Sequence, residues 1–382
     1  MKKFNKFLSV AVASAMVMAM AGCGNTDNGS AATGTNAATE SAAASDSAAS
    51  GSVFKIGGIG PTTGGAAVYG LAVQHGAEIA VEEINAAGGI NGYQVEFKFQ
   101  DDEADAEKSV NAYNALKDWG AQIIDGSTTS GACIAVTDKT KEDNMFQITP
   151  SGSAVECVQY DNNFRVCFSN PNQGLASAQY IGENGLAEKI AVIYDSSDVY
   201  SSGIYEKFAK EAENQPFEIV AAEAFTADNK TDFSVQLQKA KDAGADMVFL
   251  PIYYQESALI LTQAAAMGYA PKWFSCDGMD GILGGVDNFD VSLTEGVMLL
   301  TPFAADATDD LTQSFVTKYK EKYGDTPNQF AADSYDAIYV IKDAIEKSGV
   351  TPDMSVSDIC DGMKAAMTEI TVDGLTLSLI HI

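Results

Sequence analysis

The chain has 382 residues, and 46% hydrophobic residues are enough to build a globular core. Lys and Arg number 23 against 52 Asp and Glu, and the resulting net charge of −29 disfavours binding to nucleic acid or to an anionic lipid surface. Arg165 is the sole arginine, so the sequence offers no arginine cluster for phosphate recognition. The two histidines, His75 and His381, do not combine with cysteines in the spacing of a zinc site.

The first 23 residues predict an export signal that ends at a lipidated cysteine. Two lysines precede an apolar stretch from Leu8 to Ala21, which is too short for a typical membrane-spanning helix. The ending Met-Ala-Gly-Cys resembles the site at which lipoprotein signal peptidase cleaves. We therefore expect residues 1–22 to be a signal peptide and Cys23 to carry a lipid that holds the chain at the outer face of the plasma membrane. An ordinary signal peptide is the alternative.

Residues 23–52 follow as a low-complexity segment. Ala, Ser, Thr, Gly, Asn and Asp dominate it and it contains no aromatic residue, so it cannot bury a core and is expected to be a flexible linker. The remaining chain, roughly 330 residues long, exceeds one ordinary core and predicts two domains of about 150 residues each.

The first half of this globular region alternates strand and helix patterns. An apolar run at 53–59 precedes a helical stripe that includes Ala77, Ala80 and Ile84 and stops at Gly88-Gly89. Strand patterns recur at 95–99, 121–124 and 145–148, and helical patterns lie between them, one of them at 106–119. This order predicts a parallel sheet with helices on both faces.

The pattern begins again after Pro171 and predicts a second α/β lobe. Its expected helices are 173–184, 204–213, 232–243 and 256–267, and its expected strands are 190–194, 218–221, 247–251 and 273–275. Two further helices, at 309–323 and 328–347, fit either lobe. The final residues, LTLSLIHI, are interpreted as a truncated or altered end, with an edge strand as the alternative.

Hydroxyl groups gather in the loops that follow the strands of the first half. In an open parallel sheet a ligand binds beyond the carboxyl ends of the strands, and free amides and hydroxyls ahead of a helix suit a carboxylate. Each loop alone is also explained by helix N-capping, but three successive loops favour a site. The candidates are Tyr69, Ser127, Thr128, Thr129, Ser130, Ser151 and Ser153.

The equivalent loops of the second half carry carboxylates beside tyrosines. Such groups can hold an ammonium through charge-assisted hydrogen bonds and cation–π attraction. With anion receptors in one half and cation receptors in the other, the two halves together suit a zwitterion. The candidates here are Tyr200, Tyr253, Tyr254, Glu256, Asp277 and Asp280.

Motifs for catalysis and cofactors are lacking in the sequence. It has no GxSxG and no Walker loop, and GGIGPTTGG departs from GxGxxG because Thr63 takes the place of the third glycine. Asp101-Asp102 is a candidate metal pair, although a solvated strand end is the stronger interpretation. We therefore expect a protein that is not an enzyme and has no cofactor and no metal.

Cysteines beyond Cys23 are odd in number, so they cannot all pair with one another. Cys157 and Cys167 flank a turn-like segment, where a local disulfide and two buried free thiols are both open interpretations. The others are Cys133, Cys276 and Cys360.

Several of these segments together resemble the leucine/isoleucine/valine-binding protein family, the type I periplasmic-binding-protein-like receptors of branched-chain amino-acid ABC transporters. The resemblance runs from about residue 53 to 374, and its most specific part is GAEIAVEEINAAGGINGYQVEF. It implies an α/β fold with two doubly wound parallel-sheet lobes joined by a three-crossover hinge, as in a Venus flytrap. The first lobe would comprise 53–170 and 302–368 and the second 172–300, with 369–382 returning to the second.

The resemblance also implies roles for individual residues. Ser130, Ser151 and Ser153 would bind an α-carboxylate, although Ser151 stands where relatives tend to have Ala or Gly and would use its backbone. Asp277 would pair with the ammonium, helped by Tyr200 and Tyr254. Tyr69 would cover the ligand side chain, and Phe330 and Tyr335 are further candidates for the pocket.

The function implied is that of an extracytoplasmic lipoprotein, monomeric, that binds a neutral or aliphatic amino acid and delivers it to the permease of an ABC importer. The alternatives are a ligand-sensing module for a membrane signalling protein and a family member that binds an amide or urea-like compound.

Overall fold

The computed structural model describes residues 51–376 and 378–380. The predicted signal peptide, the lipidation site Cys23 and nearly all of the predicted linker lie outside the described residues. Within the described part of the chain, no helix combines the length and apolar character needed to cross a membrane.

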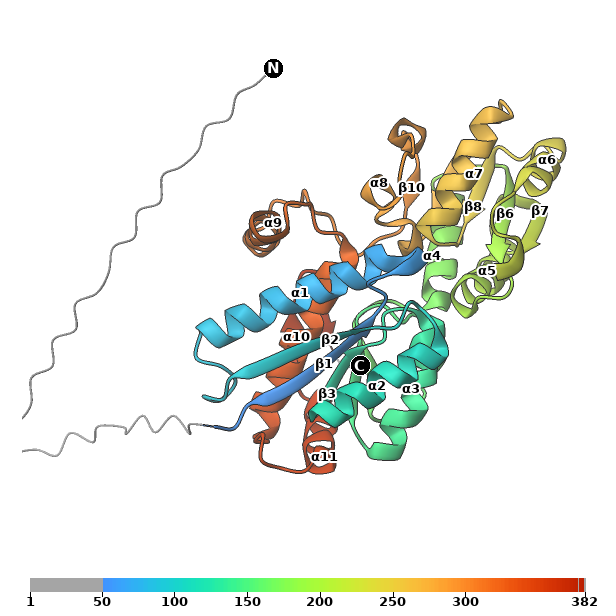
Figure 1. Ribbon diagram of the computed structural model, residues 1–382. Helices are drawn as coiled ribbons and strands as arrows, with labels where there is room; N and C mark the ends of the chain where they lie inside the picture. Colours follow the sequence, from blue (N-terminus) through green and yellow to red (C-terminus); the bar gives the residue numbers. More distant parts are fainter. Residues whose placement is uncertain (1–50, 377, 381–382) are drawn as a thin grey trace, which may run out of the picture. The chain divides into compact units, whose positions relative to one another are not determined.

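The first sheet is entirely parallel and has the strand order β2-β1-β3-β4-β5 (Figure 1). Helices α2 and α3 pack against each other, and α2 contacts β1 and β2, whereas α1 and α10 form a second packed pair. The elements are β1 (Phe54–Gly60), α1 (Ala67–Ala86), β2 (Val95–Asp101), α2 (Ala106–Trp119), β3 (Ile123–Gly126), α3 (Ser130–Asp143), β4 (Phe146–Thr149) and β5 (Asn163–Arg165).

The second sheet is also parallel, with the order β10-β9-β8-β6-β7. The predicted α/β fold with two parallel-sheet lobes is therefore confirmed. Its elements are α4 (Asn170–Glu183), β6 (Lys189–Asp195), α5 (Val199–Ala212), β7 (Glu218–Phe225), α6 (Ser234–Asp242), β8 (Met247–Leu250), α7 (Tyr254–Ala266), β9 (Lys272–Ser275), α8 (Ile282–Gly285) and β10 (Met298–Leu299).

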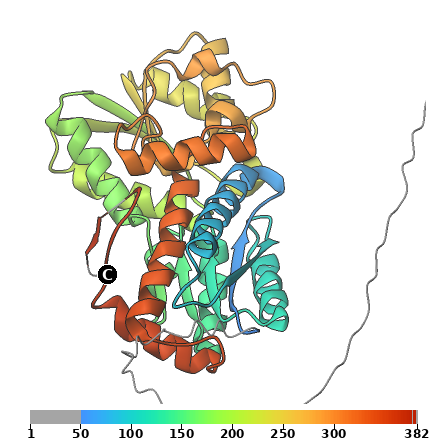
Figure 2. The ribbon, with the colours of Figure 1, turned by 90° about the vertical axis from the view of Figure 1, so that its left-hand side faces the viewer.

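After β10 the chain returns to the first sheet. Helix α10 (Gln329–Ser348) runs beside α1 and contacts β3 and β4, which assigns to the first lobe a helix that the sequence left open (Figure 2). Helix α9 (Asp310–Tyr323) precedes it and α11 (Val356–Met367) follows it. Strands β11 (Thr371–Asp373) and β12 (Ser378–Ile380) pair antiparallel. The exact lobe boundaries stay a prediction.

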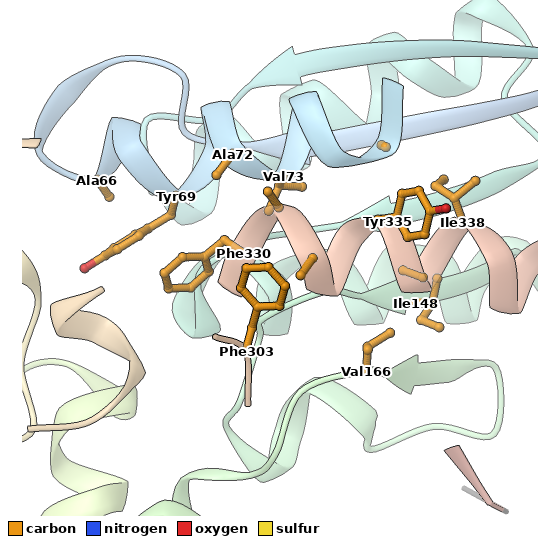
Figure 3. Close-up of a cluster of buried hydrophobic side chains, with 14 of the residues drawn as sticks. Ala66, Tyr69, Ala72, Val73, Ile148, Val166, Phe303, Phe330, Tyr335 and Ile338 are labelled. Carbon is orange, nitrogen blue, oxygen red and sulfur yellow. The ribbon is translucent and has the colours of Figure 1, made fainter. Parts of the chain in front are cut away.

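A continuous apolar core lies between α1, α10 and the first sheet. Ala72 and Val73 of α1 face Phe330 and Ile338 of α10, and Ile148 of β4 lies below them (Figure 3). All five side chains are at most 5% exposed. This packing fixes α10 and, with it, the position of its first residues near the strand ends.

Several elements begin earlier than the sequence pattern indicates, because capping decides the starts of helices. Asp198 accepts hydrogen bonds from the N–H groups of Tyr200 and Ser201, so α5 begins at Val199 rather than at residue 204. The sequence analysis missed α11, β5, α8, β10 and β11, whereas β12 lies in the final residues, where an edge strand was the alternative interpretation. Short 3₁₀ turns add η1 (Gly64–Ala66), η2 (Val155–Val158), η3 (Ala227–Asn229), η4 (Asp277–Met279) and η5 (Val291–Thr294).

Candidate functional site

The first-lobe side of the site is a set of hydroxyl groups at the carboxyl ends of β3 and β4. Ser130 is the first residue of α3, and its Oγ accepts hydrogen bonds from the N–H groups of Ser153 (3.2 Å) and Ala154 (3.1 Å). Ser151 Oγ donates to the Thr128 carbonyl at 2.6 Å. The two loops are thus tied together by their own hydroxyl groups, which pre-organises the surface they present.

Two hydroxyls in these loops are buried and have no hydrogen-bond partner among the described residues. They belong to Thr129 and Ser153, which are 6% and 0% exposed. A buried hydroxyl without a partner costs free energy, so such groups commonly mark a place where a ligand or water binds. Together with the N-terminus of α3, they form a surface suited to an anion.

The second-lobe side centres on Asp277, the first residue of the 3₁₀ turn η4 after β9. Tyr200 Oη donates to its Oδ1 at 2.6 Å, and Gln173 Nε2 donates to its Oδ2 at 2.9 Å. The Asp277 N–H in turn donates to Gln173 Oε1 at 3.4 Å. No lysine or arginine is among these partners, and burial raises the pKa of the carboxyl to about 6 despite the hydrogen bonds.

A small cavity, partly open to solvent, joins the two sides, and the space in it that admits a water-sized sphere is about 20 Å³. Its lining comes from the loop before α3 and the first residue of that helix, the loop after β4, the first turns of α5 and α10, the residue that precedes α7, and η4. The lining residues are Thr128, Thr129, Ser130, Ser151, Tyr200, Tyr253, Asp277, Gly278 and Phe330. An anion-receptive surface and a buried carboxylate are therefore brought to one small cavity.

Of the seven predicted ligand-binding residues, four line this cavity, namely Ser130, Ser151, Tyr200 and Asp277. Ser153 is buried behind them. Tyr254 is also buried and is the first residue of α7, so its neighbour Tyr253 reaches the cavity instead.

Tyr69 does not line the cavity but links elements of the two lobes. Its hydroxyl, pointing away from α1, donates to the Gly278 carbonyl and accepts from the Tyr254 N–H at 3.2 Å (Figure 3). Its ring packs against Phe330 with 4.5 Å between ring centroids. Tyr69 thus supports the wall of the cavity. Tyr335, the other aromatic candidate on α10, donates to Glu83 Oε2 at 2.7 Å instead.

Gln173 and Gln329 were missed by the sequence analysis, because a glutamine in a helical pattern carries no signal of its own. Gln329, the first residue of α10, donates from Nε2 to the Asp277 carbonyl at 3.0 Å and from its backbone N–H to Asp280 Oδ2 at 3.0 Å. Both glutamines are at most 1% exposed. They hold the 3₁₀ turn that carries the carboxylate.

The remaining candidates are occupied elsewhere. Asp101 is exposed and accepts hydrogen bonds from the Thr62 N–H and the Thr63 hydroxyl, whereas Asp102 is buried and accepts the Ala104 N–H, so the expected solvated strand end holds for the first carboxylate only. Glu256 forms an ion pair with Lys230 at 3.0 Å. The described residues contain no group of His, Cys, Asp and Glu arranged for a metal ion. The Cys157–Cys167 disulfide is absent, since both are buried free thiols.

Comparison with known proteins places this geometry in a family. Residues 53–379 match the periplasmic binding protein family, and the chain belongs to it. A leucine-, isoleucine-, valine-, threonine- and alanine-binding protein of Pseudomonas aeruginosa is 30% identical over 302 residues, which cover 77% of this chain and 78% of the relative. Leu/Ile/Val-binding protein homolog 3 of Brucella melitensis is 30% identical over 300 residues, or 78% and 80% of the two chains.

Solved structures agree on the fold. The branched-chain amino acid transporter substrate-binding protein LivJ of Streptococcus pneumoniae, in complex with isoleucine, aligns with a TM-score of 0.74 at 27% identity over 85% of this chain and 91% of that one. The leucine-binding protein LivK of Thermotoga maritima gives 0.75 at 27% identity, over 86% and 91%. A benzoate complex from R. palustris, at 20% identity and a TM-score of 0.73, supports the fold alone.

Proposed function

We propose that this chain is the extracytoplasmic substrate-binding protein of an ABC importer and that its ligand is a neutral, aliphatic amino acid. The observation that carries the proposal is Asp277, a buried carboxylate that has no cationic partner among the described residues and shares one cavity with the hydroxyl groups ahead of α3. Relatives whose names specify leucine, isoleucine and valine support the same ligand class. Binding requires no chemical step, so no enzymatic activity is proposed.

The amino acid would bind with its two charged groups at opposite sides of the cavity. Its carboxylate would accept hydrogen bonds from the Thr129 hydroxyl and from the N-terminus of α3, where the helix dipole favours an anion. Its ammonium would pair with Asp277, whose carboxylate is already oriented by Tyr200 and Gln173. A carboxylate at this position disfavours an aromatic acid that lacks an ammonium group.

The ligand side chain would lie against aromatic surfaces. Phe330 and Tyr253 line the cavity, and Tyr69 stands behind both, with ring centroids 4.5 Å and 5.4 Å away. These rings offer apolar surface but no charge, which suits an aliphatic chain.

Transport would follow from the same geometry. A ligand that contacts both lobes stabilises their closed arrangement by its differential affinity, and the permease would recognise that arrangement. Lipid attachment at Cys23 would keep the protein at the membrane surface, where it would act as a monomer. A sensing role would use the same closure with a different membrane partner, and adjacent permease and ATPase genes would favour transport.

The test is a thermal-shift panel on the full chain with Leu, Ile, Val, Phe, Ala, Glu, urea, acetamide and benzoate. A true ligand at about 100 times its Kd adds roughly 2.7 kcal/mol to the free energy of unfolding, visible as a rise in Tm of several degrees. Shifts with neutral amino acids alone would support the proposal. A shift with benzoate or the amides but not with amino acids would overturn it.

A matched pair of variants assigns the site. Asp277→Ala removes the proposed ammonium partner and is expected to weaken leucine binding by about 2 kcal/mol, or roughly 30-fold. Asp287→Ala makes the same change at an exposed position of the second lobe and should leave the Kd unchanged. Equal affinities for both variants in calorimetry would reject Asp277 as the partner.

A further inference from the structure

Two buried thiols lie in contact directly beneath the hydroxyl loops of the site. Cys133 is in the first turn of α3, three residues after Ser130, and Cys157 is in the turn η2. They are 0% and 1% exposed and form a small apolar cluster with Ala154. The thiol of Cys157 donates to the Ser130 carbonyl at 3.7 Å, and its side chain shares this cluster with Cys133.

The third cysteine of this region is placed differently. Cys167 follows β5 and is not part of the cluster, although it is closer to Cys157 in the sequence than Cys133 is. The Cys133 sulfur is further held in place by Gln147, whose Nε2 lies 3.6 Å away. Gly152 packs against it so closely that a Cβ on this glycine would lie 3.1 Å from the sulfur. Tertiary packing thus selects Cys133 as the neighbour of Cys157.

We propose that Cys133 and Cys157 form a disulfide that links α3 to η2 under the ligand-binding loops. The oxidant would be a disulfide, either a small molecule or the active site of a thiol–disulfide oxidoreductase. One thiolate attacks a sulfur of that disulfide and forms a mixed disulfide, and the second thiolate then displaces the remaining thiol. The two cysteines lose two protons and two electrons in total, and the oxidant leaves as two thiols.

Burial decides when this reaction can occur. The adjacent Cys133 and burial both raise the pKa of the Cys157 thiol well above its usual value, so Cys157 offers little thiolate in the folded, reduced protein. Oxidation would take place during folding after export or in a local opening of η2. Once formed, the bond would be equally shielded from external reductants.

The structural consequence is a covalent closure of the segment that contains β4 and Ser151. The hydroxyl of Ser130 already binds the N–H groups of Ser153 and Ala154, and the disulfide would reinforce that connection. Pairing of the thiols does not depend on the proposed amino-acid ligand. An experiment on the bond therefore succeeds or fails independently of the proposed function.

The test is peptide mapping under non-reducing conditions. The full chain is refolded in a mixture of reduced and oxidised glutathione, alkylated and digested. The expected result is a cross-linked peptide pair that contains Cys133 and Cys157, and a Tm about 5 °C above that of the fully reduced protein. Cys133→Ser and Cys157→Ala should each abolish the cross-link, whereas Cys360→Ser, at a buried cysteine of α11, should retain it.

Two results would overturn the proposal. One is a peptide pair that joins Cys157 to Cys167. The other is wild-type protein in which both Cys133 and Cys157 are recovered as alkylated free thiols after refolding with the oxidant. Because the decisive measurement uses the wild-type chain, a variant that fails to fold does not affect it.

Discussion

The hydroxyl of Tyr200 donates a hydrogen bond of 2.6 Å to Oδ1 of Asp277, and the Tyr200 hydroxyl oxygen accepts a hydrogen bond from the Gly278 N–H at 2.9 Å. Tyr200 therefore holds both the carboxylate and the backbone of the turn that carries it. Because it belongs to α5 and Asp277 follows β9, the contact connects two elements that are far apart in the sequence.

Tyr200→Phe is expected to weaken amino-acid binding about tenfold. The change removes one charge-assisted hydrogen bond to Asp277 and leaves the Gly278 N–H without its acceptor, which costs about 1–3 kcal/mol. Isothermal titration calorimetry with leucine measures the effect. Tyr205→Phe, on the same helix at a ring that stacks on Tyr194, is the matched control and should bind as the wild type does. Equal Kd values for both variants would contradict this role for Tyr200.

Amino-acid binding is expected to weaken as the pH falls below about 6. Burial raises the pKa of Asp277 to about 6 in the ligand-free protein, and only the anionic carboxylate attracts an ammonium group. The Kd should rise roughly tenfold for each pH unit below that value. Titrations at several pH values between 4.5 and 8 measure it. In Asp277→Asn this part of the pH dependence should vanish, and its persistence would assign it to another group, such as Asp198, whose pKa is also raised to about 6 by burial.

In the ligand-free protein, ionisation of Asp277 should lower the free energy of unfolding. A carboxyl whose pKa is higher in the folded state than in the unfolded state stabilises the folded protein at low pH, and this contribution is lost as the pH rises from about 4 through about 6. Asp277→Asn should therefore gain stability relative to the wild type between pH 5 and pH 8. Urea unfolding at the two ends of this range measures the difference, and a constant difference between the two proteins would refute the prediction.

Gly278→Ala is expected to displace residues of the site, because the structure leaves no room for a methyl group at this position. An added Cβ would lie 2.6 Å from the Tyr200 hydroxyl and 2.9 Å from the Ile252 carbonyl, so the turn or Tyr200 must move. Overpacking of this kind costs about 1–3 kcal/mol, and the displaced Asp277 should reduce leucine affinity at least tenfold. Gly284→Ala is the control, since a Cβ there meets nothing within 4 Å. Comparable Tm and Kd values for the two variants would contradict the prediction, because they would show that the turn accommodates a Cβ at position 278.

Tyr69→Phe should lower stability by about 1–3 kcal/mol, because it leaves the buried Tyr254 N–H and Gly278 carbonyl without their shared partner. Differential scanning calorimetry gives the change in Tm. Tyr180→Phe removes a hydroxyl from a ring that is 53% exposed and serves as the control. If leucine affinity fell but the Tm did not change, Tyr69 would be a ligand contact, as the family resemblance implies, and not a support.

The class of fold follows from the amino-acid pattern alone. Segments with strand periodicity alternate with segments of helix periodicity in each half of the globular region. Apolar runs such as 53–59 and 247–251 are continuous because parallel strands are buried on both faces. The sequence also predicts hydroxyl groups at the sheet edge of one half and carboxylates at that of the other, because the residues that follow parallel strands lie at the same edge of the sheet. Ser130, Ser151, Tyr200 and Asp277 follow from that rule, and all four line the cavity.

Tertiary structure decided what periodicity does not encode, namely which side chains point into the cavity and which elements meet there. Helix α7 begins at Tyr254, so Tyr253 lines the cavity and Tyr254 is buried in the core. Gln173 and Gln329 reach Asp277 from helices 104 and 52 residues away in the chain. Cys157 packs in one cluster with Cys133 rather than with Cys167, its nearer neighbour in sequence, for the same reason. Such contacts depend on the packing of whole helices against two sheets, and no local pattern contains that information.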